Sequence, residues 1–145
     1  DAIYDPKAAG NEAASARLAE RELARLGWDE PRRQRVVAMI DATATHEVPS
    51  DVDAELATDV AVLLDADLAV LGSEPASYEA YVAGVRSEYA HVSDGDWREG
   101  RTRVLQTFLD RPSLYATATA HELWDARARA NLAAEVASLA GRTYR

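Results

Sequence analysis

The sequence predicts an all-α fold, and three observations carry that prediction. Apolar residues recur at helical spacing in six segments, no segment longer than a few residues alternates between apolar and polar side chains, and Gly or Pro marks the segment boundaries. A chain of 145 residues is long enough to bury one core. We therefore expect residues 1–145 to form one domain, a helical bundle of about six helices.

The first two helices are expected between residues 11 and 47. The segment 11–27 ends at Gly27, a residue suited to capping a helix, and its apolar positions are Ala14, Leu18, Leu23 and Leu26. Pro31 is tolerated in the first turn of the second helix, whose apolar stripe comprises Val36, Val37, Ile40 and Ala44. Pro49 disfavours helical backbone at the residue before it, so His46 and Glu47 are expected near the end of this helix.

Four further helices are predicted in the rest of the chain, over about 53–71, 75–89, 96–110 and 119–140. The second of these carries a stripe of Tyr78, Tyr81, Val82, Val85 and Tyr89, which is consistent with either a core or an interface. The third has a predicted buried face of Trp97, Val104, Leu105 and Phe108.

Composition narrows the classes of function. Hydrophobic residues make up 48% of the chain and charged residues 28%, as in ordinary globular proteins. The net charge of −9 disfavours binding to a nucleic-acid polymer or to an anionic membrane surface. The chain has no Cys and no apolar run near the roughly 18 residues of a membrane span, so we expect a cytoplasmic protein.

Charged residues on predicted apolar faces are the candidates for a site. Helical spacing from Leu56 places Asp67 in the middle of the apolar stripe and Asp65 on the opposite face. A carboxylate in such a place caps a helix, pairs with a buried Arg, binds a metal or acts in catalysis. Arg101 lies on the buried face of its own helix, where it is suited to bind either a phosphate or Asp67 itself. Arg86 flanks the Tyr stripe in a similar way, and the last helix adds two weaker anomalies, Asn131 and Glu135.

Histidine is rare in this chain. His46 follows a Thr-rich helix end, where it is either a cation near the last carbonyl groups or a contact for a metal or phosphate. His91 and His121 are expected to be surface or capping residues. No Gly-rich phosphate loop, nucleophile elbow or His-Glu-x-x-His motif is present, so any chemistry comes from scattered side chains on helices.

Seven segments, in order along the chain, resemble one bacterial family, the predicted metal-dependent phosphohydrolases of the HD superfamily. They are Asp1-Ala-Ile-Tyr-Asp5-Pro, Asn11-Glu12-x-x-Ser15-Ala, Ala-Thr-x-x-His46, Leu64-Asp65-Ala-Asp67-Leu-x-x-Leu-Gly72, Arg86-x-x-Tyr89-x-His91-Val, Gly100-Arg101-x-x-Val-Leu-x-x-Phe-Leu and Ala-Arg129-x-Asn131-Leu. The resemblance implies a helical HD-domain fold in which an adjacent His-Asp pair, an earlier His and a later Asp hold a divalent metal.

The resemblance also assigns residues. It implies that Asp1 is the Asp of the pair, that Asp67 is the later Asp, and that His46 is an additional ligand. Both expected His residues would precede residue 1, so we expect the domain to be incomplete at its N-terminus and this chain to bind metal poorly. Mixed His and carboxylate ligation suits Mn, Fe, Co, Ni, Zn or Mg.

The expected activity is metal-dependent hydrolysis of a small phosphate ester, with a nucleotide as one such substrate. Arg86 and Arg101 are the candidates to bind the substrate phosphate, and Glu12 or His46 to orient the attacking water. The alternative is a non-catalytic helical binding or structural module that keeps the HD fold. The sequence leaves open whether the protein forms a homodimer.

Overall fold

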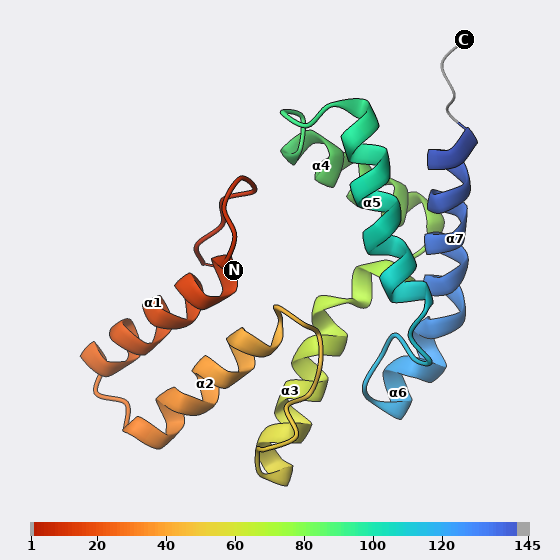
Figure 1. The fold of residues 1–145 in the computed structure, drawn as a ribbon. Helices are drawn as coiled ribbons and strands as arrows, with labels where there is room; N and C mark the ends of the chain where they lie inside the picture. The colour runs from red at the N-terminus through yellow and green to blue at the C-terminus, as the bar shows by residue number, and fades with distance from the viewer. Residues whose placement is uncertain (1, 142–145) are drawn as a thin grey trace. The chain divides into compact units, whose positions relative to one another are not determined.

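The structure is a computed structural model, and it describes residues 2–141. This part of the chain is helical and contains no strand, which confirms the predicted all-α class (Figure 1). The chain divides into two compact units, Asp1–Asp67 and Leu68–Arg145. The single-domain organisation stays a prediction. Within residues 2–141, no helix combines the length and apolar character needed to cross a bilayer.

The first unit contains three helices, α1 (Asn11–Arg25), α2 (Glu30–Ala42) and α3 (Ala54–Asp67). Gly27 has a φ of +78°, the left-handed conformation expected where α1 ends. Asp29 begins α2 by accepting a 3.0 Å hydrogen bond from the backbone N–H of Arg32, with Pro31 in the first turn. α1 packs along α2, and α2 in turn contacts α3.

The core of the first unit lies between α2 and α3. Ala42, at the end of α2, packs with Leu56, Val60 and Leu64 of α3. Val60 is fully buried. The predicted stripe of α1 is only partly correct, because Leu26 is 74% exposed at the point where that helix ends.

The second unit contains three longer helices, α4 (Pro75–Glu88), α5 (Asp94–Leu109) and α7 (Ala126–Gly141). Three short elements accompany them within residues 68–141: a 3-10 turn η1 (Ala69–Gly72) precedes α4, and one turn of helix α6 (Ala118–Ala120) and a π-helical turn η2 (His121–Asp125) lie between α5 and α7. The predicted last helix is therefore interrupted near its start. The six helices of 13 to 16 residues found within residues 2–141 match the expected number.

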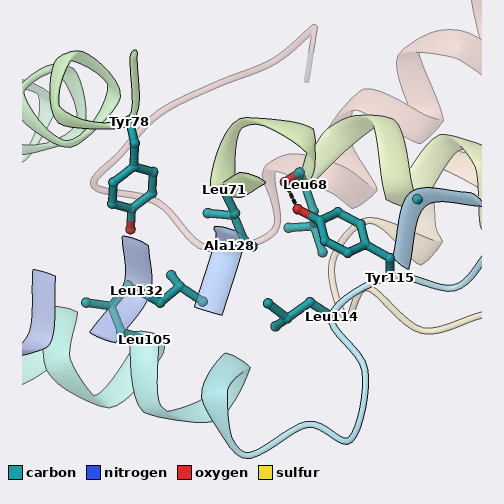
Figure 2. Packing of buried hydrophobic residues seen from close by; sticks show 9 residues of the cluster. Leu68, Leu71, Tyr78, Leu105, Leu114, Tyr115, Ala128 and Leu132 are labelled. Carbon is teal, nitrogen blue, oxygen red and sulfur yellow. Dashed lines mark hydrogen bonds between the residues drawn. The ribbon is translucent and has the colours of Figure 1, made fainter. Parts of the chain in front are cut away.

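Figure 2 shows the core of the second unit, in which Tyr78 points toward α7 and Leu105, Ala128 and Leu132 lie close to one another. The Tyr115 hydroxyl donates a 3.2 Å hydrogen bond to the carbonyl of Leu68, so this buried polar group is satisfied. The predicted face of α5 holds for Leu105, but Val104 is 48% exposed. The burial of Tyr78 confirms a core role for this member of the Tyr stripe.

Candidate functional site

His46 lies four residues beyond the last residue of α2, in a strained backbone conformation. Its φ of +53° is the one positive value found for a non-glycine residue in the described part of the chain. The backbone N–H of His46 donates a 2.9 Å hydrogen bond to the carbonyl of Ala42, which holds the turn closed. A left-handed residue with a side chain is costly, so this turn fixes the direction of the imidazole at some expense in stability.

His46 contacts Asp67, the last residue of α3. Its Nε2 lies 2.8 Å from Oδ2 of Asp67, although 21 residues separate the two in the sequence. The His46 side chain is 20% exposed and that of Asp67 is 50% exposed. The first unit therefore brings together two residues that the sequence selected separately.

The predicted burial of Asp67 is wrong, as is the predicted exposure of Asp65. Asp65 is 4% exposed, whereas half of the Asp67 side chain is open to solvent. The prediction continued one helix through Leu71, but α3 ends at Asp67 and the chain tightens into a 3-10 turn. Helical spacing does not describe Asp67 at this junction, and the burial of Asp65 inside α3 has no such explanation.

The His46 contact sets the ionisation of Asp67. The hydrogen bond to the imidazole holds the pKa of Asp67 below its ordinary value of 3.8, and partial burial opposes this effect only in part. Asp67 is therefore a carboxylate at neutral pH. An anionic oxygen beside an imidazole nitrogen is a donor set that divalent transition metals accept.

The two other predicted site residues of this unit are Asp1 and Glu12. Asp1 lies outside the described residues. Glu12 lies in the first turn of α1. No group of three or more His, Asp or Glu side chains within residues 2–141 is arranged to hold a metal ion. The His46–Asp67 pair thus provides two donors.

Arg86, a predicted phosphate ligand, stabilises the connection between α4 and α5. Its guanidinium donates hydrogen bonds to the carbonyls of Tyr89 and Val92 at 2.7 and 3.3 Å and to Asp94 at 2.7 Å. It also lies over the ring of Trp97, 5.3 Å from the centroid. Arg86 therefore stabilises the backbone turn that follows α4.

Arg101 is buried as the sequence predicts, and its partner is Glu135 of α7. Its Nε and Nη2 donate hydrogen bonds to the two carboxylate oxygens at 2.7 and 3.1 Å, with both side chains at least 90% buried. The Tyr78 hydroxyl donates a third hydrogen bond to Glu135 at 2.5 Å. The suggested pairing of Arg101 with Asp67 is thus replaced by a cluster that joins α4, α5 and α7.

Electrostatics within this cluster favour the charged form of Arg101. Burial alone would lower the pKa of Arg101, but the Glu135 carboxylate raises it above the ordinary range. Burial and the same carboxylate raise the pKa of Tyr78, so its hydroxyl stays a donor. Glu135 was visible in the sequence only as a weak anomaly, because an Ala-rich helix gives little indication of which face is buried.

A cavity of about 1130 Å³ lies beside this cluster, lined by residues of α4, α5 and α7. Glu135 and Tyr78 line it together with Asn131, Val82 and Trp97. No sequence pattern indicates this cavity, because it depends on how three helices pack. It belongs entirely to the second unit.

Comparisons with known proteins find no family model, no curated protein and no solved structure that matches this chain significantly. The resemblance to the HD superfamily therefore stays a prediction.

Proposed function

We propose that this chain is part of a metal-dependent phosphohydrolase of the HD superfamily, with His46 and Asp67 in its metal centre. The observation that supports this most is the 2.8 Å contact between His46 Nε2 and Asp67 Oδ2. The resemblance implies that both residues are ligands, and they are in contact although 21 residues separate them in the sequence.

The chemistry of the pair fits a divalent metal. An imidazole nitrogen and a carboxylate oxygen together suit Mn, Fe, Co, Ni or Zn better than Ca, and Mg is a further candidate. The half-exposed Asp67 carboxylate is reachable from solvent, and its lowered pKa keeps it free of a proton at neutral pH. The strained turn at His46 holds the imidazole toward it. Asp1 is the third ligand in this proposal.

The chain's own residues have limited, definable roles in such a reaction. A bound divalent ion would supply an acidified water and polarise a phosphoryl oxygen. Asp67 holds negative charge beside the ion, and His46 either binds it or orients the water. Glu12 remains a predicted alternative for orienting that water.

The substrate in this proposal is a small phosphate ester, and the suggestion of a nucleotide rests on analogy with the superfamily alone. Arg86 and Arg101 already donate to carbonyl and carboxylate groups. Both guanidinium groups therefore already have a role in holding the fold together. The proposal therefore depends on His46 and Asp67 and not on the two arginines.

A hydrolysis screen tests the proposal. The protein, expressed from its complete reading frame, is assayed on a phosphate monoester and a phosphate diester with each candidate metal. We expect metal-dependent turnover that Asp67→Asn lowers at least about 100-fold, as loss of a metal-site residue does. Asp59→Asn is the matched control, because Asp59 lies on the same helix and its carboxylate binds Arg35. Turnover that is absent, or equal in the two variants, contradicts the proposal.

The alternative is a non-catalytic helical module, and one observation favours it. Arg101 and Glu135 form a buried structural pair, so one predicted phosphate ligand already has a role in the fold. Under this alternative the His46–Asp67 contact only joins the end of α2 to α3. The same screen separates the two, since a structural pair gives no metal-dependent turnover.

A further inference from the structure

The cavity among α4, α5 and α7 shares no lining residue with the His46–Asp67 pair, because all its lining residues belong to the second unit. Its volume of about 1130 Å³ is close to the roughly 300–1,000 Å³ of typical small-molecule sites. It is therefore large enough to take a drug-sized organic molecule.

The walls of this cavity are mainly apolar. Val82 comes from α4, Trp97 from α5, and Ala134 and Leu139 from α7. Binding of an apolar ligand body between these walls is favourable, because it removes apolar surface of both the ligand and the protein from water.

One polar atom in the wall has unused hydrogen-bonding capacity. Asn131 is 8% exposed, and its side-chain nitrogen donates to the carbonyls of Leu71 and Ser73 at 2.8 and 3.0 Å. Because both partners are acceptors, the atom that faces them must be the nitrogen. No donor to the amide oxygen is found among the described residues. Asn131 lines the cavity, which makes its amide oxygen the candidate acceptor for a group inside it.

Charge around the cavity is balanced. The carboxylates of Glu79, Asp94 and Glu135 are matched in number by three guanidinium groups: those of Arg86 and Arg98, and that of Arg101, which binds Glu135. Both oxygens of Glu135 already accept hydrogen bonds, from Arg101 and Tyr78. A ligand with a full charge would therefore have to give up hydration in a cavity whose charges nearly cancel, whereas a neutral ligand does not.

We propose that this cavity binds a neutral organic molecule with an apolar body and a hydrogen-bond-donating end, such as an amide or alcohol. The apolar body contacts Val82, Trp97 and Leu139. The donor group binds the side-chain oxygen of Asn131. This site contains neither His46 nor Asp67, and it takes a different class of ligand from the proposed metal centre.

Three probes with the same apolar body and different head groups test this proposal. They are 4-phenylbutanamide, 4-phenylbutanoate and 4-phenylbutylammonium, each titrated into the full chain and followed by NMR. The signals observed are the Asn131 side-chain amide and the Trp97 indole. We expect saturable shifts with the amide at a dissociation constant on the order of 1 mM. The two charged probes should bind at least about tenfold more weakly.

Two Trp variants on α7 provide the matched control. Ala134 is exposed and lines the cavity, whereas its neighbour Ala133 is exposed and does not. Ala134→Trp should weaken binding of the amide at least about tenfold by filling the cavity, and Ala133→Trp should leave it unchanged. Absence of a saturable shift, equal effects of the two variants, or a charged probe that binds as tightly as the amide would each overturn the proposal.

Discussion

Nε2 of His46 lies 2.8 Å from Oδ2 of Asp67, and this contact joins the turn after α2 to the last residue of α3. Figure 1 shows these two helices and the long connection between them. The contact predicts a pH dependence. Because the folded-state pKa of Asp67 is depressed below 3.8, its contribution to stability is present above that value and is lost as pH falls through the folded pKa.

Urea unfolding of the wild type and of His46→Asn between pH 2 and 7 measures this contribution. The difference in unfolding free energy between the two proteins should shrink as pH falls below about 4. The effect should be small, since half of the Asp67 side chain is exposed. A difference that stays constant over the acidic range would show that Asp67 has no such role.

The left-handed backbone conformation of His46 leads to a separate prediction. His46→Ala and His46→Gly both remove the imidazole, but only Gly adopts a φ of +53° without strain. His46→Gly should therefore be more stable than His46→Ala by about 1 kcal/mol in urea unfolding. Equal stability, or a more stable Ala variant, would mean that the turn relaxes when the side chain is changed.

The buried pair of Arg101 and Glu135 predicts strongly non-additive energetics. Arg101→Met or Glu135→Met alone leaves an unpaired charge in a site that is at least 90% buried, at a cost of about 3–5 kcal/mol. The double variant removes both charges and should cost much less than the sum of the single changes. A double-mutant cycle by urea unfolding measures the coupling. Simple additivity would contradict the proposed pairing.

Gly72 packs directly against Trp124. A Cβ added at Gly72 would lie 2.5 Å from the Cβ of Trp124, so Gly72→Ala should destabilise the fold by about 1–3 kcal/mol. Gly84 is the control, since a Cβ there meets no atom within 4 Å and Gly84 lies inside α4. Gly84→Ala should stabilise by about 0.5–1 kcal/mol. Thermal unfolding of both variants distinguishes the effects, and a neutral Gly72→Ala would mean that η1 shifts away from Trp124.

Much of the fold follows from local sequence signals. Pro31 and Gly27 mark real helix boundaries, and the helices form where apolar spacing predicts them. Apolar spacing does not predict the start of a helix where a side-chain cap decides it. The Ser93 hydroxyl accepts a hydrogen bond from the backbone N–H of Asp96, so α5 begins at Asp94 rather than at Asp96.

The candidate sites depend on longer-range packing and are less accessible from sequence. Periodicity correctly placed Arg101 in the interior, but its partner Glu135 is 34 residues away and no local rule selects it. For Asp67 the same reasoning gave the wrong burial, because a helix end does not follow the spacing of its interior. The contact with His46 comes from the packing of α2 against α3.

The central claim is that His46 and Asp67 bind one metal ion. The most direct measurement is a titration of the protein, expressed from its complete reading frame, with Mn²⁺ below one equivalent, followed by paramagnetic broadening of backbone NMR signals. We predict that the signals of His46 and Asp67 broaden first, that Asp67→Asn removes the effect, and that Asp59→Asn retains it. Broadening centred on another acidic group, or unchanged in Asp67→Asn, would contradict the account.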